Sequence, residues 1–294
     1  MARKIARKLR QYSVHGFINP SDQDGLVIDY SDFFEEMKDS KSSEFSFKLG
    51  SETVAMSTVE DLQEYRAFLF VRGSESSITI FNERTGVTEE ANLPDDYIAV
   101  TATWLIWQKD TRFVFVESNR PGVGYTAIEK YFTAYGKEIL NHPNFTFDLN
   151  PVPGPEFEKQ IGRFTRIREV SVVLNRPNHV WESAHLLIGD ASESDAQTIE
   201  LSARAPRKQT LSKIKGIVPR VIQYAAEKIT GLKDARVYGD MPGTVGEQTV
   251  SLKKSQVVAS ASIDSESDPS QNLIAYRDAL MELDREGLPA KDQL

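Results

Sequence analysis

Residues 112–139 read RFVFVESNRPGVGYTAIEKYFTAYGKEI and predict a strand, a turn and a helix in succession. Residues 113–116 are apolar at four consecutive positions, which is typical of a strand covered on both faces. Turn-forming residues fill 119–124, and Thr126 and Glu129 have the spacing of a capping box at a helix start. The helix then presents an apolar face of Ile128, Tyr131, Phe132, Tyr135 and Ile139. We therefore expect a central strand with a helix packed over it.

Further strands are expected on both sides of this stretch. Alternating or continuous apolar runs occupy 45–49, 67–71, 78–81 and 98–107, with turn residues between them. The last of these runs and residues 113–116 should form a hairpin. A short acidic helix is expected at 30–37. Residues 1–150 are thus predicted to form an N-terminal domain with an open mixed sheet and covering helices.

A proline-rich segment, residues 143–155, marks the expected domain boundary, because four prolines and a glycine disfavour a helix. A second α/β domain is expected at 155–265. Its predicted helices lie at 157–164, 180–188 and 210–229, the last with Pro219 inside, and its predicted strands lie at 169–174, 198–203, 235–239, 249–253 and 257–263. A C-terminal helix and tail are expected at 270–294. The fold class is therefore two-domain α/β (α+β).

The composition limits the classes of protein to consider. With 294 residues, of which 40% are hydrophobic, the chain has enough apolar residues for a sizeable core. It contains no cysteine, which excludes disulfides and thiolate sites, and no apolar run long enough to cross a bilayer. The basic N-terminus is not followed by an apolar segment, as a secretory signal would be. We expect a cytoplasmic protein.

Two motifs carry weak chemical signals. Gly122 and Gly124 precede the expected helix as in a phosphate-binding loop, but the sequence lacks a third glycine in register, so a plain turn is the better interpretation. His179, Glu182 and His185 are potential metal ligands, but on a helix the two outer residues would diverge, so ordinary surface or core histidines are the better interpretation. We expect no enzyme activity, no catalytic residue, no metal and no cofactor.

Basic residues gather in two short intervals, although the net charge of the chain is −8. Phosphate binding requires local clusters of cations, because charges are screened over about 8 Å at physiological salt. The candidate DNA-binding residues of these intervals are Arg204, Arg207, Lys208, Lys213, Lys215 and Arg220, with Arg163, Arg166 and Arg168. An alternative is that these cations neutralise acidic groups across a domain or dimer contact.

The first ten residues include Arg3, Lys4, Arg7 and Lys8 and no acidic residue. If this arm is helical, a narrow apolar seam runs through a basic surface. Three interpretations stay open: a solvated terminal helix, an arm that contacts phosphates, and attachment to a membrane surface.

The order of several segments resembles that of the RexA exclusion proteins of temperate phages, over residues 66–283. The similar segments are the Phe113–Glu117 strand, Gly124-Tyr125-Thr126, the helix with Tyr131-Phe132, the 169–174 strand, LLIGD at 186–190, the 198–203 strand leading into 207–217, and a helix with Tyr276-Arg277. The acidic net charge departs from what a DNA-binding family suggests.

This resemblance implies a two-domain fold related to the recombination-associated protein RdgC. It further implies a homodimer that binds double-stranded DNA without sequence preference, acts in phage exclusion and in the lysis/lysogeny decision, and works beside a membrane protein encoded next to it. The candidate residues come from the charge argument, not from the family. The alternative function is an interaction or sensor protein that binds a protein partner, or its own second subunit, through the basic surface.

Overall fold

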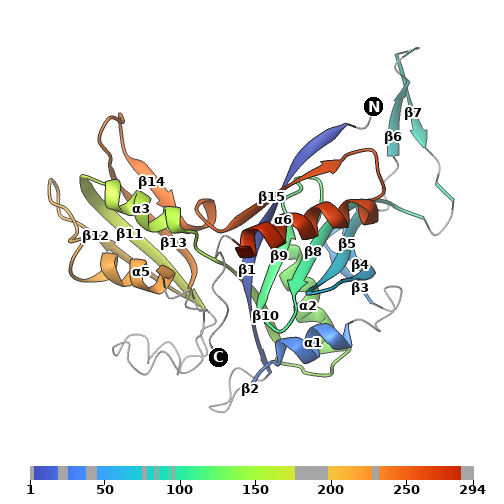
Figure 1. The fold of residues 1–294 in the computed structure, drawn as a ribbon, viewed down its shortest axis with the longest axis horizontal. Coiled ribbons are helices and arrows are strands. Elements are labelled where there is room, and N and C mark those ends of the chain that lie inside the picture. Colours follow the sequence, from blue (N-terminus) through green and yellow to red (C-terminus); the bar gives the residue numbers. More distant parts are fainter. Residues whose placement is uncertain are drawn as a thin grey trace.

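The computed structural model describes residues 3–18, 26–37, 45–74, 78–82, 84, 86–91, 93–94, 97–175, 198–226 and 232–285. It contains two units side by side (Figure 1), and each is an antiparallel sheet with covering helices. The two-domain α+β fold is thereby confirmed. All described strand pairs are antiparallel, so the expected mixed sheet is purely antiparallel.

The larger unit is built on a nine-stranded sheet with the order β10-β1-β9-β8-β5-β4-β3, in which β15 and β2 also pair with β1. Its strands are β1 (Lys4–Ile18), β2 (Leu26–Val27), β3 (Ser46–Leu49), β4 (Glu52–Leu62), β5 (Tyr65–Ser74), β8 (Ala99–Gln108), β9 (Phe113–Glu117), β10 (Thr146–Pro151) and β15 (Val258–Asp264). The expected strands at 45–49, 67–71, 98–107 and 113–116 and the 98–116 hairpin are confirmed.

The N-terminal arm is the long strand β1 and not a helix. Its first half pairs with β15, its middle with β9 and its second half with β10. Burial alternates over the first residues of β1, with Lys4 and Lys8 exposed and Leu9 fully buried, as expected for a strand with one face on a core, whereas residues 11–17 are all buried. The sequence did not indicate this strand, because its pairing partners β9 and β15 lie more than a hundred residues away along the chain.

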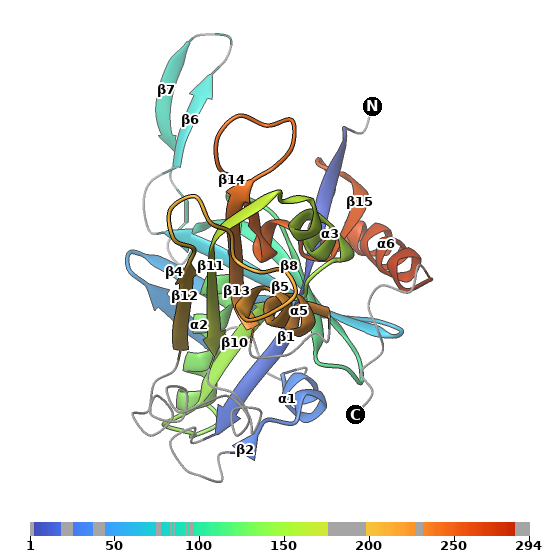
Figure 2. The ribbon, with the colours of Figure 1, turned by 90° about the vertical axis from the view of Figure 1, so that its left-hand side faces the viewer.

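Helices cover both faces of this sheet. One face packs against α1 (Tyr30–Glu36) and α2 (Tyr125–Glu138), and the opposite face packs against α6 (Leu273–Arg285). Figures 1 and 2 show α2 and α6 on opposite sides of the strands. Val114 and Val116 of β9 contribute to the first core, and Phe113 and Phe115 contribute to the second. Burial on both faces explains the unbroken apolar run of β9.

The start of α2 differs from the expected capping box. The residue that caps the helix is Gly124, with no side-chain hydrogen bond, and Glu129 instead accepts a hydrogen bond from the Leu149 amide of β10, at 2.8 Å. The apolar face is confirmed for Ile128, Tyr131, Phe132 and Tyr135, all buried, whereas Ile139 is exposed.

The smaller unit is a four-stranded sheet with the order β12-β11-β13-β14. Helices α3 and α5 pack on one face of it, and their apolar side chains form a third core. The bounds are α3 (Pro155–Arg163), β11 (Arg166–Asn175), β12 (Thr198–Arg204), α5 (Ile217–Ala226), β13 (Leu232–Asp240) and β14 (Gln248–Ser251). The helix expected at 180–188 lies outside the described residues.

Two expectations about this unit need correction. The helix predicted from residue 210 begins only at Ile217, so Pro219 lies in its first turn, where proline is tolerated, and does not kink it. The chain also returns to the larger unit after a short 3-10 helix, η2 (Leu252–Lys254), because β15 pairs with β1 and α6 packs on the nine-stranded sheet. The segment 155–265 therefore ends in a strand of the first unit.

A separate hairpin of β6 (Ile78–Asn82) and β7 (Val87–Ala91) projects from the larger unit (Figures 1 and 2). Within the described part of the chain, none of the helices has the length and apolar character of a membrane span.

Candidate nucleic-acid interface

The loop from residue 205 to 216, between β12 and α5, carries four of the candidate cations, Arg207, Lys208, Lys213 and Lys215. It runs along the start of β11, because the amides of Ala205 and Leu211 each donate to a backbone carbonyl there, of Arg168 and Ile167, at 2.8 Å. The Ile167 amide in turn donates to the Thr210 hydroxyl, at 3.0 Å. These bonds place the cations of this loop, hereafter the basic loop, beside those of α3 and β11.

Three candidate arginines are neutralised by carboxylates. The Arg204 Nε donates to Glu169 Oε2 at 2.7 Å, and Arg168 forms ion pairs with Asp240 at 3.0 Å and Glu247 at 3.6 Å. Asp240 also pairs with Arg166, at 3.6 Å. These arginines therefore organise the end of the sheet, and their binding of phosphate stays a prediction.

Lys213 has a structural contact as well. Its ammonium donates to the carbonyl of Gly162, at 2.8 Å, and to that of Phe164, both at the end of α3. Carbonyl groups at a helix C-terminus lack partners within the helix, so a lysine there stabilises both the helix and the loop. Lys213 thus fixes the basic loop against α3.

Four exposed cations remain: Arg207, Lys208, Lys215 and Arg220. No described residue forms an ion pair with any of them. Lys208 sits at a left-handed φ of 64° in a turn closed by the bond from the Gln209 amide to the Pro206 carbonyl. Arg163 at the end of α3 is also exposed, and together with the closer Lys159 it lowers the pKa of Glu156. Five of the nine second-unit candidates thus lie on or beside this loop as exposed cations with no ion pair or carbonyl contact in the described part of the chain.

The candidates of the N-terminal arm lie on the other unit. Figure 1 shows β1 running along the larger unit, away from the loop between β12 and α5. Arg3, Lys4 and Lys8 are exposed there, so the arm does not join the basic loop within one protomer. Its binding of phosphate or of a membrane surface stays a prediction.

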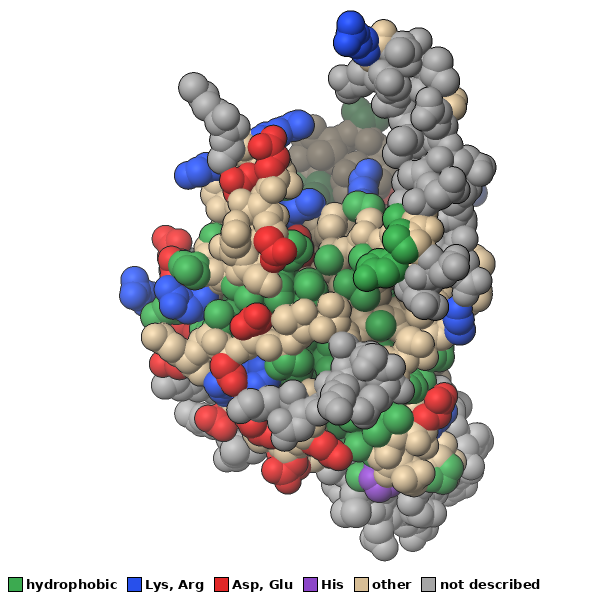
Figure 3. Space-filling view, turned by 90° about the vertical axis from the view of Figure 1, so that its right-hand side faces the viewer, with side chains coloured by type: hydrophobic (Ala, Val, Ile, Leu, Met, Phe, Trp, Pro, Cys, Tyr) green, Lys and Arg blue, Asp and Glu red, His purple; other side chains and the backbone are tan. Residues whose placement is uncertain are grey.

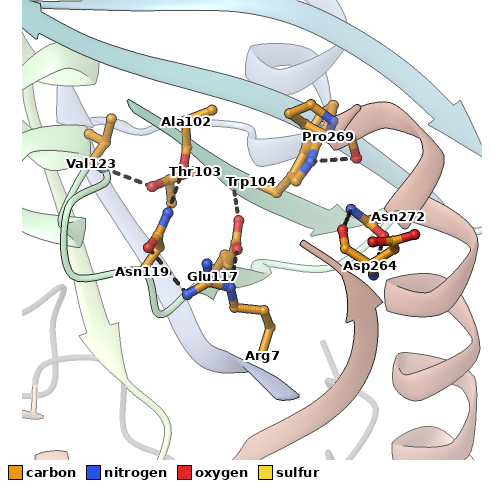
Figure 4. A network of polar contacts seen from close by, with 10 residues as sticks. All are labelled: Arg7, Ala102, Thr103, Trp104, Glu117, Asn119, Val123, Asp264, Pro269 and Asn272. Carbon is orange, nitrogen blue, oxygen red and sulfur yellow. Dashed lines mark hydrogen bonds and ion pairs between the residues drawn. The ribbon is translucent and has the colours of Figure 1, made fainter. Parts of the chain in front are cut away.

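Arg7 belongs to a polar network at the point where β1 and β8 diverge past the end of β9 (Figure 4). Its Nε lies 3.5 Å from Glu117 Oε1, and its Nη1 donates to Asn119 at 3.2 Å. Glu117 also accepts the Trp104 amide at 3.2 Å and the hydroxyl of Tyr276, whose pKa is raised by burial and by this carboxylate. A cavity of about 190 Å³ adjoins the network. The carboxylate is thus fully engaged in holding strands together.

The junction between the units contains a charged cluster that the sequence did not reveal. Lys233 of β13 donates to Asp148 of β10 at 2.7 Å, which joins the two sheets. Buried Glu129 lies nearby, and loss of solvent raises its pKa to about 7. Lys253 lies over the ring of Tyr125, 5.9 Å from its centre. These residues are far apart in sequence, so no local spacing could have indicated the cluster.

Four large apolar side chains within residues 93–100 are exposed, which sequence reasoning missed. They are Leu93, Tyr97, Ile98 and Val100, close in sequence to the β6–β7 hairpin. Figure 3 shows hydrophobic side chains at the surface of this end of the molecule. Grouped apolar residues open to solvent are typical of protein-binding surfaces.

Within the described ranges, no three His, Asp or Glu side chains come close enough to hold a metal ion. The candidate ligands His179, Glu182 and His185 lie outside those ranges. Comparison with protein-family models and with curated proteins found no match to this chain.

Proposed function

We propose that this protein binds double-stranded DNA without sequence preference through Arg207, Lys208, Lys215 and Arg220, with Arg163 beside them. The observation that carries this proposal is that Arg207, Lys208, Lys215 and Arg220 are exposed on or next to one loop and form no ion pair with a described residue. The net charge of the whole chain is −8. Such a surface releases counterions from the DNA backbone, and this release is the main source of non-specific affinity.

The proposed contact is with phosphates and not with base edges. These cations lie on a loop and in the first turns of α5, and phosphate contacts of this kind position a protein on the duplex without reading its sequence. The net negative charge of the rest of the molecule limits the bound area to this surface.

We further propose a homodimer, and the exposed apolar patch near β6–β7 supports it, because burying such a surface is favourable. A role in phage exclusion and in the lysis/lysogeny decision, a cytoplasmic location and a membrane protein as partner rest on the resemblance to RexA alone. The proposed function requires no catalysis and no cofactor.

The test is a double charge reversal, Arg207→Glu with Lys208→Glu, assayed on several unrelated duplexes. Binding should weaken about equally on all of them, and the slope of log affinity against log salt should become shallower by about two, one per lost phosphate contact. The matched control is Lys130→Glu with Lys137→Glu, two exposed lysines of α2. This control makes the same change in net charge elsewhere. Equal losses in both variants would remove the basic loop from the proposal.

A second candidate is a protein partner with an acidic surface. The ion pairs of Arg204 with Glu169 and of Arg168 with Asp240 and Glu247 favour it, because they show that this end of the sheet already binds carboxylates. In that case the Arg207→Glu and Lys208→Glu variant should lose the partner or the dimer, while the wild-type protein should bind no DNA.

A further inference from the structure

Ile214 at the tip of the basic loop is an apolar side chain held in solvent. It is 85% exposed, and Lys213 and Lys215 flank it in the sequence. Among the described large apolar residues that are exposed, only Ile214 stands between two cations. The bonds to α3 account for Lys213 and the proposed phosphate binding accounts for Lys215, but neither accounts for an isoleucine between them.

The loop presents Ile214 through specific backbone contacts. The Ser212 hydroxyl accepts hydrogen bonds from the amides of Ile214 and Lys215, at 3.2 and 3.1 Å. On one side of the tip, Lys213 is bonded to the end of α3. On the other side, Gly216 adopts a left-handed φ of 83° and α5 begins immediately after it. The tip is therefore fixed to the sheet and helices at both ends.

The surroundings of Ile214 discriminate between possible partners. The centre of a protein interface is depleted of charge, which does not suit a lone apolar residue between two lysines. A bilayer rewards apolar area, and the free energy gained by burying one isoleucine is smaller than the free energy that association costs. DNA suits this pattern, because the cations supply affinity from phosphates while one apolar side chain suffices to enter a base step.

We propose that Ile214 is a wedge that enters the minor groove and partly unstacks one base step, so that the bound duplex is bent. The inference rests on the proposed DNA binding and names how that site holds the duplex. The exposed cations of the loop, Arg207, Lys208 and Lys215, contact the phosphates on either side of the wedge. In this proposal the cations supply the affinity for DNA, and the apolar side chain of Ile214 causes the bend.

Bending is tested by energy transfer between dyes at the two ends of a short duplex, at saturating protein. The wild-type protein should bend the duplex by an angle in the range of about 20–90°. The Ile214→Ala variant should bind with a salt slope like that of the wild type but should lose most of the change in energy transfer. The matched control is Val245→Ala, a fully exposed apolar residue of the β13–β14 loop that stands between Thr244 and Gly246 and should bend DNA normally.

Equal bending by Ile214→Ala and wild type would overturn the wedge and leave the proposed DNA binding intact. Absence of DNA binding by the wild-type protein would overturn both. The last measurement is binding of the protein to vesicles with and without anionic lipid. Vesicle binding that depends on Ile214, together with unbent DNA, would assign the tip to a membrane surface and contradict the inference.

Discussion

Glu129 is a buried carboxylic acid close to the contact between the two units. Burial raises its pKa from 4.5 to about 7, while the Leu149 amide and Lys233 act in the opposite direction. The folded protein therefore holds the proton of Glu129 more tightly than the unfolded chain does. Its contribution to stability is complete below pH 4.5 and is lost as the pH rises through 7.

We predict that Glu129→Gln becomes more stable relative to the wild type as the pH rises from 5 to 8. Glutamine keeps an acceptor for the Leu149 amide and carries no charge to desolvate. Each unit of pKa shift corresponds to about 1.4 kcal/mol, so the relative gain should approach about 2–3 kcal/mol above pH 7. Urea unfolding of both proteins at pH 5, 7 and 8 measures it. A difference independent of pH would show that Glu129 titrates normally.

At the scale of the element, α2 depends on a glycine where β10 approaches it. A Cβ added to Gly136 would lie 2.1 Å from Cδ1 of Phe145, a fully buried ring. Gly162 of α3 is the matched case, because a Cβ added there meets nothing within 4 Å. The two helical glycines thus differ in packing.

Gly136→Ala should destabilise the protein by about 1–3 kcal/mol, because the phenyl ring must move in a close-packed core. Gly162→Ala should be neutral or stabilising by up to about 1 kcal/mol, since alanine loses less backbone entropy in a helix. Chemical denaturation of the two variants compares them. Similar losses in both would indicate that helix propensity, and not the contact with Phe145, decides the result.

The two lysines beside Ile214 should behave differently. Lys213→Met removes the bonds to the α3 carbonyls, so it should destabilise the smaller unit by about 1–3 kcal/mol. Lys215→Met should leave stability within about 0.5 kcal/mol, because its side chain is exposed and has no ion pair among the described residues. Thermal or urea unfolding followed in parallel separates them. A stable Lys213→Met variant would contradict the anchoring role.

Elements with a strong local pattern could be predicted from the sequence. The apolar run of β9 and the face of α6 with Leu273, Tyr276 and Leu280 depend on residues that are neighbours in the chain. The strand β1 could not be recognised, because its partners β9, β10 and β15 come from distant parts of the sequence. A continuous helix was expected over 210–229, and the loop before Ile217 was missed, because contacts with the distant β11 and α3 hold that loop.

The sequence predicted the region of the candidate site, but it did not predict which of its cations form ion pairs. Sequence reasoning located the basic intervals, and the structure brings the basic loop, α3 and β11 together. It could not show that Arg204 is paired with Glu169, because the two residues meet only through the pairing of β11 and β12. Which cations are free depends on strand register, which no local pattern reveals.

At the scale of the whole molecule, the smaller unit is inserted into the larger one. The chain leaves the nine-stranded sheet after β10 and returns to it in β15, and Lys233 with Asp148 joins the units beside this crossing. The basic loop lies on the smaller unit, and the exposed apolar patch lies on the larger one. This separation leaves the proposed dimer contact and the proposed DNA surface independent of each other.

The most direct measurement is the salt dependence of the affinity of the wild-type protein for a random duplex, by anisotropy titration between about 50 and 200 mM salt. The four cations of the proposal that form no ion pair with a described residue predict a slope of about −3.6, and hence roughly a hundredfold loss of affinity across this range. A slope near that value or steeper would support DNA binding through the basic loop. A slope near zero, or no binding at the lowest salt, would contradict it.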